Sequence, residues 1–140
     1  MKKLVPSYLL QFALVATVLT IIFRYFLSYG IDNESTVIVV LSSVLYFICM
    51  FIAGWYFGKK DSNYLPIYDV GFRFHFTTYL VHILISELWF VMNFNSHYEN
   101  IWVVHLTAIF WGIGLLFHFL FFLINRKKTI NGLDKQNLFD

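Results

Sequence analysis

Four long runs of apolar residues, separated by short polar segments, dominate the pattern of this chain of 140 residues. The runs cover residues 4–27, 37–57, 72–94 and 101–124. A helix needs about 20 apolar residues to cross the hydrocarbon core of a bilayer, and each run reaches that length. The pattern predicts an all-α integral membrane protein, a four-helix bundle made of two transmembrane helical hairpins, in a single domain over residues 1–140.

Basic residues mark one side of the predicted spans. Every Lys and Arg except Arg24 precedes the first run, flanks the connection between the second and third, or follows the fourth. These residues are Lys2, Lys3, Lys59, Lys60, Arg73, Arg126, Lys127, Lys128 and Lys135. The other two connections carry acidic residues and no Lys or Arg. Because positive charge is retained on the cytoplasmic face, both termini are expected to be cytoplasmic.

The composition narrows the classes of function. Of the chain, 59% is hydrophobic and 13% is charged, and the four spans leave no room for a separate soluble catalytic domain. No catalytic motif is present, so an enzyme is not expected. The net charge of +2 follows from the membrane topology and does not indicate nucleic-acid binding. The first run is longer than the apolar region of a signal peptide, which has about 7–15 residues, and is predicted to be a retained span.

Polar residues recur at helical spacing in the third and fourth runs. Residues three, four and seven apart share one face of a helix. The third run has His75, Thr78, Tyr79, His82, Ser86, Trp89 and Asn93 at such spacing, and the fourth has Thr107, Trp111, Gly114, His118 and Asn125. Polar side chains in a bilayer turn away from lipid. An interior polar stripe is therefore predicted, composed of His75, Tyr79, His82, Ser86, Trp111, Gly114 and His118.

The histidines of this stripe leave three interpretations open. Counted from Arg73 and Arg126, His82 and His118 lie at a similar depth of roughly 12–14 Å. His118, with either His82 or His75, has the chemistry to hold haem b or a metal ion, because imidazole ligates both. The same side chains are equally suited to interhelical hydrogen bonds, or to a site that senses a proton or a ligand.

A charged cluster is predicted near the opposite, outer ends of the spans. An unpaired charge inside a bilayer is costly, so Arg24 is expected to pair with Glu87, with His105 as a third member. The alternatives are an Arg24 side chain that extends outward to the interface, and a protonatable relay through His105 or Glu87. His105 also shares a helix face with Ala108 and Gly112, whose small size suits close helix packing.

The end of the second run and the connection that follows it carry two further signals. Gly54 and Gly58 have the G-x-x-x-G spacing that lets two helix backbones approach closely. The connection over residues 58–71 is rich in aromatic and aliphatic residues and is expected to lie against the bundle. Within it, Asp69 is predicted to cap the third helix and to pair with Arg73.

The second half of the chain, residues 70–123, resembles the 2TM domain family of Bacteroidota membrane proteins. The residues that carry the resemblance are Phe74, His75, Tyr79, Trp89, Phe90, the run Trp111-Gly112-Ile113-Gly114-Leu115, and His118. The family pattern has an Asn one turn after the Tyr, where this chain has Ile83. The resemblance implies a bacterial membrane module, found alone or attached to signalling proteins such as histidine kinases, and it implies no reaction.

The features together favour a small polytopic protein of the bacterial inner membrane that acts without catalysis, in sensing or in binding a partner. Besides the lipid bilayer, the expected partner is a second copy of the chain or another membrane protein, and the tail over residues 131–140 is a candidate docking segment. One alternative is an electron-transfer subunit with a b-type haem or a metal ion held by the histidines. A second alternative is an oligomeric channel or transporter.

Overall fold

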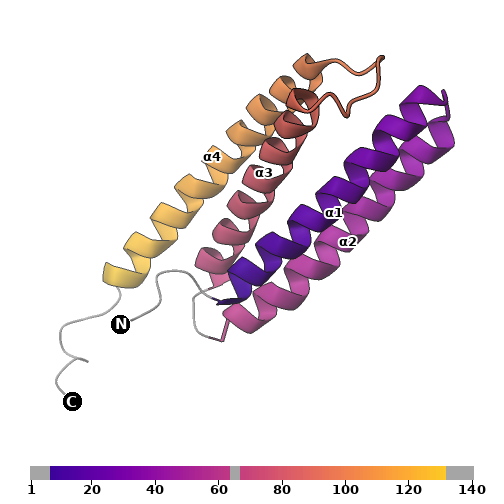
Figure 1. Cartoon of the computed structure of the whole chain (residues 1–140). Coiled ribbons are helices and arrows are strands. Elements are labelled where there is room, and N and C mark those ends of the chain that lie inside the picture. Colours follow the sequence, from indigo (N-terminus) through magenta and orange to yellow (C-terminus); the bar gives the residue numbers. More distant parts are fainter. Residues whose placement is uncertain (1–6, 64–66, 132–140) are drawn as a thin grey trace.

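The computed structural model describes residues 7–63 and 67–131, which form four α-helices (Figure 1). The helices are α1 (Ser7–Asp32), α2 (Thr36–Asp61), α3 (Ile67–Val91) and α4 (Ile101–Asn131). All four are long and apolar enough to cross a membrane. The predicted class, an all-α four-helix bundle of a multi-pass membrane protein, is confirmed. The predictions for Lys2, Lys3, Lys135 and the tail after Asn131 concern positions outside the described residues.

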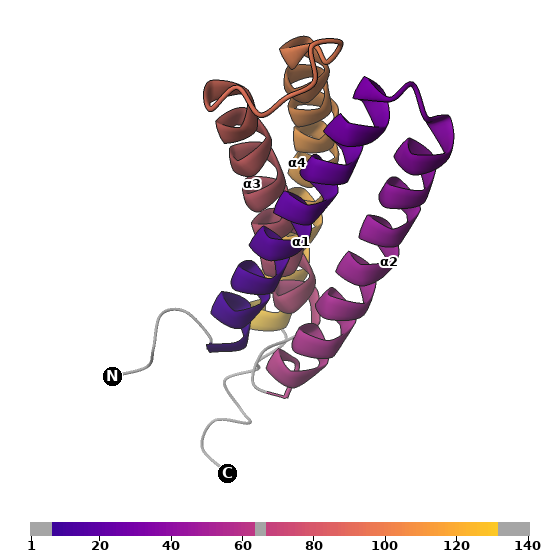
Figure 2. The ribbon, with the colours of Figure 1, turned by 45° about the vertical axis from the view of Figure 1, so that its right-hand side comes forward.

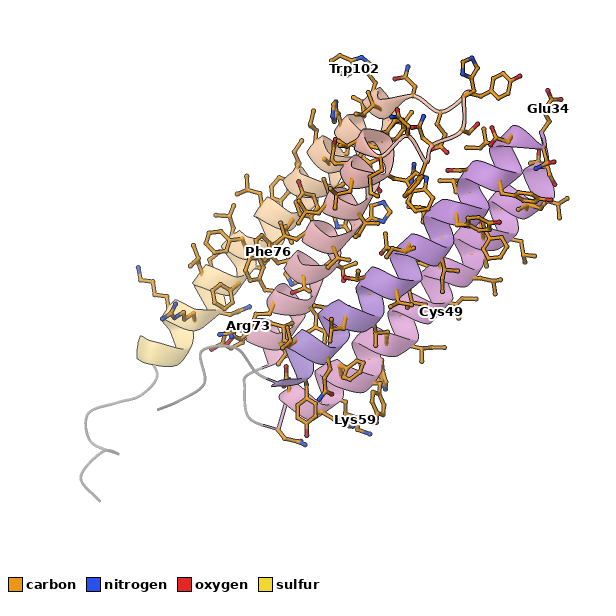
Figure 3. All side chains as sticks on the ribbon, in the orientation of Figure 1. Glu34, Cys49, Lys59, Arg73, Phe76 and Trp102 are labelled. Carbon is orange, nitrogen blue, oxygen red and sulfur yellow. The ribbon has the colours of Figure 1, made fainter. Side chains whose placement is uncertain are left out.

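The helices form an open arrangement rather than a bundle closed around one axis. α1 lies between α2 and α3 (Figure 2). α4 packs on α3, and within the described part of the chain its backbone makes no close approach to α1 or α2. The start of α1, the α2–α3 connection and the end of α4 lie at one end of the molecule (Figure 1). Lys59 and Arg73 lie at this end, and Glu34 and Trp102 lie at the opposite end (Figure 3).

The interior is more polar than the surface, as the bilayer environment requires. The buried polar and charged side chains among the described residues are Thr20, Arg24, Ser28, Asp61, Ser86 and Ser96. Large apolar side chains cover the outside of all four helices, for example Phe47 at 70% exposed and Phe110 at 71% exposed. Lipid chains solvate such side chains as well as a protein interior does, whereas buried polar groups need partners within the protein.

A compact apolar core joins the first three helices toward the end that holds Lys59. Phe12 of α1 is 1% exposed, and its ring lies 4.8 Å from the ring of Phe74 and 6.4 Å from that of Phe57. Ala16 and Val70 complete the buried cluster. Since α1 contributes a residue at every turn of this contact, it is the helix around which α2 and α3 assemble.

The α1–α2 hairpin turns within a few residues. Glu34 adopts a positive φ of 52°, and the Ser35 N–H donates to the Gly30 carbonyl over 2.8 Å, the pattern of a helix that ends in a left-handed residue. The Ser35 hydroxyl then accepts from the Ile38 N–H and caps α2. A Cβ on Gly30 would lie 3.0 Å from Ile38 Cγ2, so a larger side chain would push the two helices apart.

The end of α3 differs from the prediction. Asn93 was expected on the polar stripe of the third span, but α3 ends at Val91 and Asn93 has a positive φ of 56°. The Phe94 N–H donates to the Trp89 carbonyl over 3.0 Å, and the two rings pack 5.3 Å apart. Asn is one of the few residues that adopts this backbone conformation readily. Its role is therefore to end the helix and not to line the interior.

The start of α3 corrects another expectation. Asp69 was expected to cap the third helix, but α3 begins at Ile67, so Asp69 lies within its first turn. There its negative charge suits the positive end of the helix dipole. The expected pairing of Asp69 with Arg73 is present, with 2.8 Å between Arg73 Nε and Asp69 Oδ1.

Candidate functional site

The contact between α3 and α4 is centred on Tyr79. Its hydroxyl donates to the Ala108 carbonyl over 3.2 Å, and its ring packs edge-on against Trp111 at 5.8 Å. A Cβ on Gly112 would lie 3.4 Å from the Tyr79 hydroxyl. The small residues Ala108 and Gly112 therefore admit the phenol against the α4 backbone, which is the close packing that their spacing predicted.

Gly114, which was predicted on the interior stripe, lies off this contact. It is exposed, and a Cβ there would meet no atom within 4 Å. Helical spacing groups Gly114 with Trp111 and His118, but the part of α4 that meets Tyr79 is at Ala108 and Gly112, and Gly114 lies to one side of it. The interior side of α4 passes through Gly112 instead.

Gly112→Leu is expected to destabilise the protein by about 1–3 kcal/mol, because the larger side chain meets the Tyr79 ring in a packed contact. Gly114→Leu is the matched control, with the same gain in helix propensity and no neighbouring atom to displace. Unfolding in mixed detergent micelles, followed by Trp fluorescence, measures both. Equal stability of the two variants would show that Gly112 is not at the α3–α4 contact.

Two of the stripe histidines meet toward the end of the molecule that holds Arg73, between α3 and α4. The rings of His75 and His118 lie 5.3 Å apart at an interplanar angle of 90°. Of the two ligand pairs that the sequence left open, this is the one that lies in contact. His118 also lies beside Gly71, where a Cβ would be 3.9 Å from its Nε2.

The pair of imidazoles is the contact that bears on the metal hypothesis. In the parts of the chain that the structure describes, no group of three or more His, Cys, Asp or Glu residues is placed to hold a metal ion. A structural zinc site takes four protein ligands and a catalytic one takes three. His75 and His118 alone match neither pattern.

His82, the third histidine of the stripe, belongs to a different contact. Its Nδ1 lies 3.1 Å from the Tyr46 hydroxyl, and that hydroxyl lies 3.0 Å from the hydroxyl of Thr20. The Thr20 hydroxyl in turn donates to the Ala16 carbonyl over 2.7 Å. These three side chains come from α1, α2 and α3, so the chain of hydrogen bonds ties the three helices together near their middle. We call Thr20, Tyr46 and His82 the central chain.

A second group of polar side chains lies toward the end of the molecule that holds Glu34 and Trp102, the end predicted to be outer, and its centre is a buried ion pair. Arg24 of α1 donates to Glu99 of the α3–α4 loop over 2.5 Å, and both side chains are 6% exposed. Glu99 also accepts from the Ser28 hydroxyl over 2.5 Å and from the Ser96 N–H over 3.1 Å. The Trp89 indole donates to Ser28 over 3.0 Å. We call these five residues the outer latch.

The outer latch corrects the predicted pairing of Arg24 with Glu87. Glu87 instead contacts His105 of α4, with 3.0 Å between His105 Nε2 and Glu87 Oε1. The physical reason is the orientation of α3. Ser86 and Phe90 face α1, and Arg24 lies over the Phe90 ring at 5.5 Å. Glu87, one residue from Ser86, faces α4 together with Tyr79.

Several members of these two groups were not anticipated. Thr20 and Ser28 were missed, although each lies four residues from the predicted Arg24, a spacing that places all three on one face of the first span. In the sequence, Glu99 is one of the acidic residues of the connection between the third and fourth spans. Nothing in the sequence indicates that this connection folds back so that Glu99 contacts α1. Tyr46 likewise carries no signal in an otherwise apolar span.

A groove of about 700 Å³ runs between α2 and α3 in the half of the molecule that holds Lys59. Its lining includes Phe12 of α1 and Trp111 of α4. One wall carries Gly54, Gly58 and Lys59 from α2, and the other carries Gly71, His75 and Thr78 from α3. The groove is open on one side, where Phe47 and Phe51 of α2 are 70% and 63% exposed.

No protein-family model, curated protein or solved structure matches this chain. The resemblance of residues 70–123 to the 2TM domain family therefore stays a prediction.

Proposed function

We propose that this protein is a non-enzymatic binding module of the bacterial inner membrane, which holds a transmembrane helix of a partner protein in the groove between α2 and α3. The observation that supports the proposal is the open side of the groove, along which apolar residues of α2 such as Phe47 and Phe51 are 70% and 63% exposed. A partner reaches such a surface by diffusion within the bilayer.

The small residues of the groove favour a helix as its occupant. Gly54 and Gly58 lie one turn apart on its α2 wall, the spacing at which two helix backbones pack closely in membranes. A Cβ at either position would not clash, because it would lie at ordinary contact distance from the protein's own core, 3.9 Å from Phe12 Cε2 and 3.6 Å from Val70 Cγ1.

A polar group on the opposite wall favours a protein partner over lipid chains. The His75 side chain is exposed, and its ring contacts only the edge of His118 among the interactions of the described residues. An imidazole that faces hydrocarbon lacks a hydrogen-bond partner, which is unfavourable in a bilayer. A polar side chain of a docked helix would provide that partner.

Orientation and family resemblance support the cellular context of the proposal. Lys59, Arg73, Arg126 and Lys127 lie toward the end where α1 begins and α4 ends, and the positive-inside rule assigns that end to the cytoplasm. The resemblance to the 2TM domain family implies a membrane module that occurs alone or attached to signalling proteins, and the bound helix would belong to such a protein or to a second copy of this chain.

Site-specific crosslinking in intact cells tests the proposal. A photoreactive amino acid at Phe51, which lines the groove, is expected to give one discrete protein adduct. The same group at Phe110, which is 71% exposed and lies outside the groove, is the control and is expected to give none. Mass spectrometry of the adduct distinguishes a second copy from another membrane protein.

The glycines provide the second arm of the test. Gly54→Leu combined with Gly58→Leu fills the groove and is expected to abolish the Phe51 adduct, whereas Gly114→Leu is expected to leave it unchanged. Adducts of equal yield from Phe51 and Phe110, or an adduct that persists when both glycines are replaced, would contradict a helix-binding groove.

A further inference from the structure

Two buried polar atoms of the bundle have no hydrogen-bond partner among the described residues. They are Nε of Arg24, in α1, and Oγ of Ser86, in α3. Arg24 is 5% exposed and Ser86 is 1% exposed. Buried polar groups are almost always hydrogen-bonded, and leaving one unpaired is particularly unfavourable inside a bilayer. Both atoms therefore need a partner that the protein itself does not supply.

The register of the two helices places these atoms at the same level. α1 and α3 run in the same direction, and the Phe12–Phe74 ring contact and the Trp89–Ser28 hydrogen bond fix how they align. In this alignment Arg24 lies opposite Ser86. The contact of the Arg24 guanidinium with the Phe90 ring, one turn beyond Ser86, agrees with that placement.

The two atoms also lie between the outer latch and the central chain. Arg24 is part of the outer latch through Glu99. Ser86 lies one turn from His82, the last member of the central chain. The two groups of hydrogen-bonded side chains thus approach each other where the unpartnered atoms lie.

We propose that water bound between Arg24 Nε and Ser86 Oγ joins the outer latch and the central chain into one polar path. Water fits the chemistry, because Nε–H needs an acceptor and the Ser86 hydroxyl both donates and accepts. An anion is not required, since Glu99 already balances the charge of Arg24. Buried water in proteins makes two to four hydrogen bonds to groups that lack other partners, typically about three.

The path runs from the α3–α4 loop to the middle of the bundle. With the water in place, and with a hydrogen bond from it or from Ser86 to the neighbouring His82 ring, the path would connect His82, Tyr46 and Thr20 to Glu99 in the α3–α4 loop. This assignment is independent of the helix-binding groove, because Arg24 and Ser86 do not line the groove.

Radiolytic footprinting of the purified protein in detergent tests the bound water directly. Hydroxyl radicals formed from water inside a protein oxidise the side chains beside it. His82 is expected to be oxidised in the wild type, and Ser86→Ala is expected to reduce that oxidation several-fold while Ser86→Thr, which keeps the hydroxyl, does not. Phe12, in the apolar core, is the internal control. Oxidation of His82 that does not change in Ser86→Ala would overturn the proposal.

The thermal midpoint of unfolding of Ser86→Ala provides a second test, because the direction in which it changes distinguishes a bound water from an unpaired hydroxyl. A water that loses one partner destabilises the protein, so the midpoint is expected to fall by a few degrees. If the Ser86 hydroxyl has no partner at all, its removal stabilises the protein. The thermal midpoint would then rise, and that result would also overturn the proposal. Ser43→Ala is the control, because the exposed Ser43 hydroxyl donates to a carbonyl of its own helix.

Discussion

Glu99→Ala is expected to lower the free energy of unfolding by about 3–5 kcal/mol, because it leaves the Arg24 guanidinium buried without its counter-charge. The same change removes the acceptor of the Ser28 hydroxyl and of the Ser96 N–H. The loop between α3 and α4 would lose its attachment to α1 at the outer end. Reversible unfolding in mixed detergent micelles measures the loss.

Glu87→Ala is the matched control for this prediction. The Glu87–His105 pair is partly exposed, with side chains 33% and 42% exposed, and such pairs contribute about 0–1 kcal/mol. A double-mutant cycle with Arg24→Met is expected to give strong coupling to Glu99 and little coupling to Glu87. The reverse result would restore the pairing of Arg24 with Glu87 that the sequence suggested.

Phe12→Ala is expected to cost about 3 kcal/mol, the lower end of the range for removing a buried phenyl ring. The ring touches both Phe57 and Phe74, so its loss leaves a cavity where three helices meet. The cost is placed at the low end because helices in a bilayer associate through packing contacts and gain little from the hydrophobic effect. Unfolding in the same mixed micelles provides the measurement.

Leu14→Ala, two residues along α1, separates packing from hydrophobicity. Leu14 is 63% exposed, and lipid or detergent replaces the contacts that its side chain loses. Its expected effect is within about 0.5 kcal/mol, as for other surface positions. If both variants lost the same stability, the Phe12 cluster would not be the centre of the three-helix contact.

The outer latch and the core at Phe12 lie at opposite ends of α1, and this explains how an open bundle holds together. α1 makes the apolar contact with α2 and α3 near one end and binds the α3–α4 loop through Arg24 near the other. α4 has no comparable contact with α1 or α2 among the described residues. Its position depends on Tyr79, on the histidine pair, and on the loop that the latch holds.

The sequence predicted the four helices because the bilayer imposes a simple requirement on length and hydropathy. An apolar run of about 20 residues has few alternatives to a spanning helix, so the class of fold followed from the pattern alone. The same periodicity found one face of α3, where His75 and Tyr79 contact α4. The cost of an unpaired charge in a bilayer had grouped Glu87 with His105 in one predicted cluster, and these two residues are in contact.

Periodicity left open which helix each polar face meets, and only the tertiary structure decided that. Two carboxylates, Glu87 and Glu99, are possible partners for Arg24. In the structure α3 is rotated so that Glu87 faces α4, and the loop residue Glu99 pairs with Arg24. His82 and His118 have similar depths but face different neighbours, since depth along a helix carries no information on rotation about its axis. The length and hydropathy of each helix are local properties of the sequence. Rotation and pairing depend on side chains from several helices at once, and therefore emerge only when the helices pack.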